Sequence, residues 1–302
     1  MRRMKKEVTA GLLVLATAAR AHLPPGFELP SVNPEIAVGW TFEAWVVVLL
    51  GASLAMYALG LARLWRNAGR GRGVSMLQAA AFAGGWVGLA AALVSPLDAL
   101  GQLLFSAHMV QHELMMVVAA PLLVLGRPLA IWTWALPMRL RRKTATITHH
   151  PAIALPWQLI TRPAVAWALH GLVLWTWHMP RFFDAALAND GIHTLQHVSF
   201  FGTALLFWWP PLASASRAGD GPAMFYLFTT MMHTAALGAL LTLAPTPWYP
   251  AYAASAGSFG IDLLTDQQLG GLIMWVPAGV AYLAVGMVVA ARTLQRRQPA
   301  SG

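Results

Sequence analysis

The sequence predicts an all-α, polytopic membrane protein: a bundle of seven transmembrane helices that follows an N-terminal signal segment. Of the 302 residues, 58% are hydrophobic and only 10% are charged, whereas soluble domains are about 45–50% apolar and about 25% charged. So few charges cannot cover a soluble surface, and the high hydrophobicity excludes a disordered chain. The apolar residues are also gathered into runs of about 20, the length that crosses a bilayer.

Residues 1–21 have the pattern of a secretory signal peptide. A 12-residue apolar core, Val8 to Ala19, is too short to span a bilayer, and the small residues Ala19 and Ala21 suit the −3 and −1 positions of a cleavage site. Cleavage would leave His22 as the N-terminus and residues 22–302 as one transmembrane domain. The alternative is an uncleaved anchor with the same orientation. The residues before the core are basic: Arg2, Arg3, Lys5 and Lys6.

Seven longer apolar runs follow, and each is expected to be a helix because lipid cannot satisfy the polar groups of an open backbone. Pro121, Pro210, Pro211 and Pro277 lie within or at the ends of these runs and are expected to kink or terminate them. The expected spans are 37–62, 76–94, 103–125, 163–180, 192–212, 223–243 and 268–291.

The net charge of +9 is explained by basic residues that orient the chain in the membrane, so the sequence predicts no nucleic-acid partner. Between and after the spans, one side of the membrane carries 14 basic residues and the other only Arg181. The positive-inside rule makes the rich side cytoplasmic. We therefore expect a bacterial inner (plasma) membrane protein with a periplasmic N-terminus after signal cleavage and a cytoplasmic C-terminus. The 14 residues are Arg63, Arg66, Arg70, Arg72, Arg127, Arg139, Arg141, Arg142, Lys143, Arg162, Arg217, Arg292, Arg296 and Arg297.

The chain has no cysteine, which excludes disulfides, thiolate metal sites and cysteine nucleophiles. A site for a soft metal must therefore use the 10 histidines and 14 methionines. His108 and His112 share one face of the third span, and His193 and His197 share one face of the fifth, because each pair has i, i+4 spacing. Both pairs are expected near the periplasmic side, so they can bring four imidazoles together.

Other residues near this side are candidates for the same metal site. His178 closes the fourth span and His233 lies in the sixth. Imidazole with neighbouring thioethers, such as those of Met115 and Met116, favours copper, with zinc as the main competitor. The carboxylates of Asp98, Glu113 and Asp266 are candidates for orienting an imidazole or assisting the site.

Each candidate also has a structural interpretation. A histidine at a membrane interface is an ordinary boundary residue, a methionine fills gaps in any core, and an acid at a helix N-terminus is favoured by the helix dipole. Two histidine pairs on one side of the membrane, at a depth where ionisable groups are rare, favour the metal site.

Sequence motifs of enzymes are missing. His112 and Glu113 begin like the metalloprotease motif HExxH, but position 116 is Met. Thr194 stands where the pair His193 and His197 would need a glutamate. The chain has no nucleophile elbow, phosphate-binding loop or dinucleotide fingerprint. We therefore expect a protein that is not an enzyme.

Five segments together resemble the CtaG-type cytochrome c oxidase assembly factors associated with caa-type oxidases, over about residues 37–291. The resemblance implies a seven-span bacterial membrane protein that supplies or inserts copper, with oxidase subunits or other assembly factors as partners. The histidines at 108, 112, 193, 197 and 233 match the family's histidine positions. Another assembly factor with the same name has a single span and binds copper through cysteines. The present chain has no cysteine, so it is not a member of that group. The segments are SPLD (95–98), FSAHMVQHELMMVVAAPLLVLGRP (105–128), IHTLQHVSFFGTALLFWWP (192–210), MMHTAALGALLTLAPTPWYP (231–250) and DQQLGGLIMWVPAG (266–279).

Two other functions remain open at this point. A membrane haem protein would ligate haem between two histidines for electron transfer, and the outer pairs supply enough imidazoles. A metal transporter would need polar residues that continue to the cytoplasmic face, where the spans are apolar. Haem and zinc therefore rank below copper as cofactors, and transport ranks third.

Overall fold

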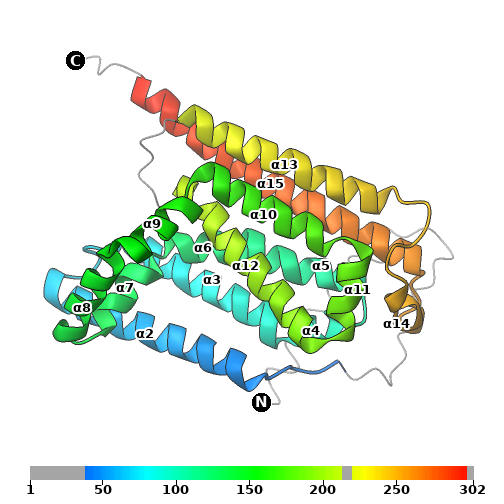
Figure 1. Ribbon diagram of the computed structural model, residues 1–302, viewed down its shortest axis with the longest axis horizontal. Coiled ribbons are helices and arrows are strands. Elements are labelled where there is room, and N and C mark those ends of the chain that lie inside the picture. The colour runs from blue at the N-terminus through cyan, green and yellow to red at the C-terminus, as the bar shows by residue number, and fades with distance from the viewer. Residues whose placement is uncertain (1–37, 213–219, 298–302) are drawn as a thin grey trace, which may run out of the picture.

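The structure is a computed structural model that describes residues 38–212 and 220–297, and the regular structure in these two ranges is helical (Figure 1). The proposed signal segment, His22 and Arg217 lie outside the described residues. The expected all-helical class is therefore correct for the described part of the chain.

Five helices in the described ranges are long and apolar enough to cross a membrane. They overlap the expected first, second, third, sixth and seventh spans, although the first runs from Ala44 to Ala68 and not over 37–62, so the chain is a multi-pass membrane protein. The third is continuous from Phe105 to Leu125 but is built of three pieces: α5 (Phe105–Glu113), the π-helix η1 (Leu114–Ala119) and α6 (Ala120–Leu125). The others are α2 (Ala44–Ala68), α3 (Met76–Val94), α13 (Asp220–Thr242) and α15 (Leu263–Arg297).

The expected fourth and fifth spans coincide with α10 (Pro163–Trp177) and α12 (Asp190–Leu212), which pack against each other inside the bundle (Figure 1). At 15 residues, α10 rises only about 22 Å, which is less than the roughly 30 Å hydrocarbon thickness. The 23-residue helix α12 is long enough, but polar residues such as His193, Gln196 and His197 lower its hydropathy. The structure thus supports five spans, and the seven-span arrangement stays a prediction.

Short helices occupy the two ends of the bundle, between the long helices (Figure 1). One end holds α4 (Pro96–Gly101), α11 (Pro180–Ala188), the 3-10 helix η2 (Pro250–Tyr252) and α14 (Ala253–Ser258); we call it the histidine end. The other holds α7 (Pro128–Ala135), α8 (Met138–His149) and α9 (Pro151–Ile160); we call it the basic end. His149 is the last residue of α8 and His150 connects α8 to α9, away from the other histidines.

Small residues let α13 and α15 pack closely side by side. A Cβ atom on Gly271 would lie 2.7 Å from the carbonyl oxygen of Gly238, and one on Gly270 would overlap the ring of Phe105. Helices in membranes associate through such close contacts, because burial gives no hydrophobic gain between segments that already lie in lipid. These glycines place the start of α15 directly against α5.

Candidate metal centre

Four histidines meet between α5 and α12 at the histidine end. Within the pairs, the ring centroids of His108 and His112 are 4.3 Å apart and those of His193 and His197 are 4.1 Å apart. Across the two helices, His108 lies 5.5 Å from His193 and 6.0 Å from His197, and His112 lies 5.4 Å from His197. The two i, i+4 faces therefore turn toward each other, as their spacing predicts.

Three of these side chains, which we call the histidine triad, are arranged as ligands of one ion would be. A ring nitrogen of each of His108, His193 and His197 lies within 4.8 Å of the other two. A metal–nitrogen bond is about 2.0–2.1 Å long, so two ligands of one ion lie up to about 4 Å apart. Small rotations of the rings would close the triad around an ion.

Four of the ring nitrogens of these histidines are buried without hydrogen bonds. Nε2 of His108, Nε2 of His197 and both ring nitrogens of His112 have no hydrogen-bond partner among the described residues. His108 and His112 are only 0% and 2% exposed. A buried polar atom without a partner costs free energy, and a bound metal ion would use these lone pairs. The residues present therefore fit a metal ion, and His112 is available as a fourth ligand.

The tautomer of His108 is set by its neighbours. Its Nδ1 lies 3.2 Å from the carbonyl oxygen of Gly101, which also accepts a hydrogen bond of 2.9 Å from the hydroxyl of Tyr252. Burial, together with the carboxylate of Asp266, raises the pKa of Tyr252 well above its usual value, so the hydroxyl keeps its proton. With Nδ1–H donating to Gly101, Nε2 of His108 keeps a lone pair that is free to bind a metal ion, the usual arrangement of a ligating imidazole.

His178 lies at the same end but behind two aromatic rings. Its Nδ1 lies 2.7 Å from the carbonyl oxygen of Leu174, and its buried Nε2 has no partner in the described part of the chain. Its ring is 5.9 Å from that of Phe200 and 6.4 Å from that of Phe183. The ring of Phe200 also packs on that of His112, with centroids 4.6 Å apart, and the ring of Phe183 packs on that of His108, with centroids 5.0 Å apart. His178 is therefore a neighbour of the triad and not a member of it.

The expectation that His233 joins this site is not met. Its ring lies 5.6 Å from that of Trp167, and a Cβ atom on Gly171 would lie 3.6 Å from its Cε1. It therefore faces α10, where His170 is within electrostatic range. The reason is its helix: α13 packs against α15 and α10, whereas the triad is built from α5 and α12.

Asp266 does not orient an imidazole. It is fully buried and accepts hydrogen bonds from the backbone N–H of Phe105, at 2.7 Å, and from the backbone N–H of Ser106, at 3.1 Å, as well as from the Ser106 hydroxyl. It therefore caps the N-terminus of α5, where a negative charge is favoured by the dipole. Asp266 therefore acts as a helix-terminal acid, as one interpretation of the sequence expected. It lies on α15, however, and the N-terminus that it caps is that of α5.

The other auxiliary candidates also differ from expectation. Glu113 has a buried oxygen without a partner in the described residues and interacts electrostatically with Tyr282 of α15, not with a histidine. The side chain of Met116 is buried in the core, while its carbonyl accepts a hydrogen bond of 2.9 Å from Trp208. The thioether that lines the pocket beside the histidines belongs to Met115.

Met115 and Met116 both lie in the π-helix η1. It starts directly after Glu113, and the N–H of Ala120 donates to the carbonyl oxygen of Met115, five residues earlier. A π-turn rotates the side chains that follow relative to an α-helix, and such turns are frequent at functional sites. The sequence gives no signal for η1, so it does not distinguish Met115 from the adjacent Met116.

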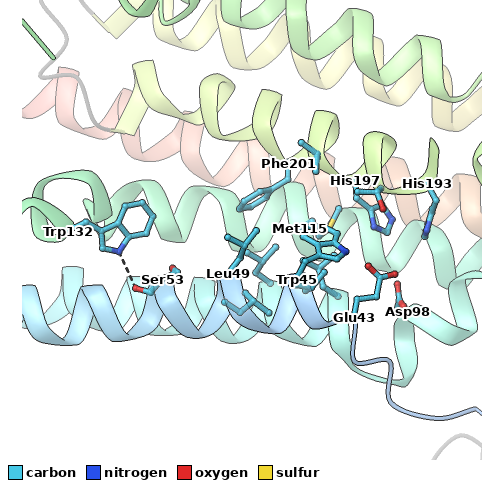
Figure 2. A pocket seen from close by; sticks show the side chains of 16 residues that line it. Glu43, Trp45, Leu49, Ser53, Asp98, Met115, Trp132, His193, His197 and Phe201 are labelled. Carbon is cyan, nitrogen blue, oxygen red and sulfur yellow. Dashed lines mark hydrogen bonds between the residues drawn. The ribbon is translucent and has the colours of Figure 1, made fainter. Parts of the chain in front are cut away.

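A pocket of about 370 Å³ opens beside the triad, between α2 and α12 and over α3 and η1 (Figure 2). At one end it is lined by His193, His197, Glu43 and Asp98, and at the other by Trp132, whose Nε1 donates to the carbonyl of Ser53 at 3.1 Å. Between the ends the walls are apolar. Asp98 also accepts a hydrogen bond of 2.7 Å from Gln111.

Comparison with known proteins gives relatives and a family. The uncharacterized protein Mb0105 of Mycobacterium bovis and the uncharacterized protein MT0111 of Mycobacterium tuberculosis are each 28% identical to the chain over 288 residues. This covers 89% of the chain but 41% of each relative, so the chain spans about two fifths of their length. No solved structure matches the chain. The family model described as cytochrome c oxidase caa3 assembly factor matches residues 55–296, and the chain therefore belongs to this family.

Proposed function

We propose that this protein supports the assembly of a cytochrome c oxidase by binding copper at the histidine triad and delivering it to the oxidase. One observation carries the proposal: three imidazole nitrogens from two helices lie within 4.8 Å of one another. Family membership supplies the oxidase. Oxidase subunits or other assembly factors are the partners, the copper ion is cargo, and the protein is not an enzyme.

Copper fits this set of ligands better than the alternatives. The triad is made of imidazoles, and the thioether of Met115 lines the adjoining pocket. Neutral nitrogen and soft sulfur favour copper over calcium or magnesium, with zinc as the competitor. A haem between two histidines needs a flat gap as wide as a porphyrin, but the four rings pack 4.1–6.0 Å apart. This packing favours a metal ion.

The proposal includes seven spans, with α10 and α12 as the fourth and fifth. The basic end is then cytoplasmic and the histidine end periplasmic. Arg63 and Arg66 at the end of α2, and the arginines of α8, support this orientation. Copper would therefore be held on the periplasmic side of the membrane.

The test is the metal and haem content of the purified protein. We expect copper in the wild type, and none in a variant in which His108, His193 and His197 are all replaced by Ala. His149→Ala is the control, because this histidine lies at the basic end of the bundle. Equal copper in the wild type and the triple variant, or a Soret band in place of copper, would contradict the proposal.

A further inference from the structure

Acidic residues gather at the histidine end, although the chain as a whole has a net charge of +9. Six carboxylates belong to this end in the described ranges, and the single Lys or Arg there is Arg181. Charge of one sign around a cleft raises the local concentration of the opposite ion and speeds its association. This end therefore attracts cations. The carboxylates are those of Glu43, Asp98, Asp184, Asp190, Asp262 and Asp266.

Two of these carboxylates line the pocket together with the triad. Figure 2 shows Glu43 and Asp98 side by side below His193 and His197. Both carboxylates interact electrostatically with His193. Glu43 precedes α2, yet its side chain makes no capping hydrogen bond to that helix. Asp98 accepts its hydrogen bond from Gln111 on Oδ1, so Oδ2 remains available. Both acids thus have oxygens that can face a cation.

The pocket is also the way to the buried histidines. His108 and His112 do not line it and are 0% and 2% exposed, whereas His193 and His197 do line it. His197 is 9% exposed, and its Nε2 has no hydrogen-bond partner among the described residues. An ion that comes from the acidic side therefore meets His193 first, and the open nitrogen of His197 next.

We propose that Glu43 and Asp98, with His193, capture a divalent metal cation at the polar end of the pocket and pass it to the triad. Carboxylate oxygens with one imidazole suit a hydrated divalent ion such as Cu²⁺, and the all-imidazole triad behind them is a softer site. His193 is a ligand in both the capture site and the triad. The ion can therefore stay bound to His193 while the two carboxylates are replaced by the other two histidines of the triad. This inference rests on the proposed function, because it concerns loading of the same triad.

The experiment measures how fast the purified, full-length, metal-free protein takes up Cu²⁺. Stopped-flow quenching of tryptophan fluorescence follows binding, since Trp45 lines the pocket. The test variant combines Glu43→Gln with Asp98→Asn, and the amide oxygen introduced by the second substitution can still accept the hydrogen bond from Gln111. At low salt we expect about tenfold slower uptake in the variant, and a difference that shrinks as salt is added. The final copper content should match the wild type.

Asp262→Asn is the matched control, because this exposed acid lies at the same end but outside the pocket. It caps α15, where Asn serves as well as Asp, and we expect wild-type uptake. Equal rates for the wild type and the double variant, or equal slowing in the control, would overturn the capture site while leaving the triad intact. A wild type that binds no Cu²⁺ would overturn the proposed function as well.

Discussion

Asp266 and Ser106, 160 residues apart in sequence, are joined by two hydrogen bonds that fix the start of α5. Because α5 carries His108 and His112, a carboxylate on α15 determines where half of the histidine cluster stands. The triad thus depends on three helices: α5 and α12 supply its ligands, and α15 holds α5 in place.

The first prediction concerns this cap. Asp266→Ala leaves the N–H groups of Phe105 and Ser106 buried without a partner, which costs about 1–3 kcal/mol of stability. Thermal unfolding of the purified protein measures the loss, and copper affinity should fall with it. Asp266→Asn keeps an acceptor and should lie between the alanine variant and the wild type. Wild-type stability and copper affinity in the alanine variant would show that α5 is held by packing alone.

The second prediction concerns the hydroxyl of Tyr252. Tyr252→Phe removes the hydrogen bond to the Gly101 carbonyl, which also fixes Nδ1 of His108. Loss of such a partner lowers metal affinity about 10–100-fold. We expect copper affinity to fall about tenfold, the lower limit, because the hydrogen bond from His108 to Gly101 remains. Competition with a copper chelator measures the affinity.

Tyr226→Phe is the control for this variant. Its hydroxyl also donates to a buried carbonyl, that of Phe207, at 2.8 Å, but it has no ring contact with the four histidines. The two variants should therefore lose similar stability and differ in copper affinity. Equal affinities would mean that Tyr252 serves packing only.

Much of this centre could be predicted because helical periodicity is a local property. The i, i+4 spacing of His108 with His112 and of His193 with His197 fixes one face on each helix, and the apolar runs fix the depth. The partner of Asp266, the place of His233 and the contact from Tyr252 depend on which helices touch, and no local pattern encodes that. The same holds for η1, the π-helix whose Met115 lines the pocket.

The third prediction separates the triad from the other histidines. His108→Ala and His197→Ala each remove one of three ligands, so copper affinity should fall by orders of magnitude. His233→Ala should leave copper binding unchanged, because this side chain packs against Trp167 and Gly171. His178→Ala should have a small effect through Phe183 and Phe200. Copper analysis after dialysis checks all four, and copper loss in the His233 variant would show that α13 reaches the site.

The fourth prediction concerns topology. Reporter fusions at residues 68, 145 and 217 should be cytoplasmic, and fusions at 186 and 255 should be periplasmic. The deciding sites are 145 and 186, because they flank α10, the 15-residue helix. If both gave the same signal, α10 would not cross the membrane. If the fusion at 217 also matched the one at 186, α12 would not cross either, and five spans would be the full number in the described ranges.

The last prediction concerns the oxidase in cells. If copper delivery is the function, loss of the protein should leave oxidase subunits made but poorly active, and His112→Ala or His197→Ala should have the same effect. His149→Ala and His150→Ala should be silent, because these residues lie at the basic end. Oxidase activity, subunit levels and the abundance of each variant must be measured together, since removal of a buried polar group also changes stability.

Growth in added copper makes this test more specific. A weakened site is filled further when the free ion concentration rises, so added copper should partly restore oxidase activity in the His112 variant, which keeps the triad. It should restore less in the His197 variant, which has lost a member of the triad. If both variants accumulate normally and support full oxidase activity in low copper, the histidines are not ligands. The protein would then assist assembly as a scaffold.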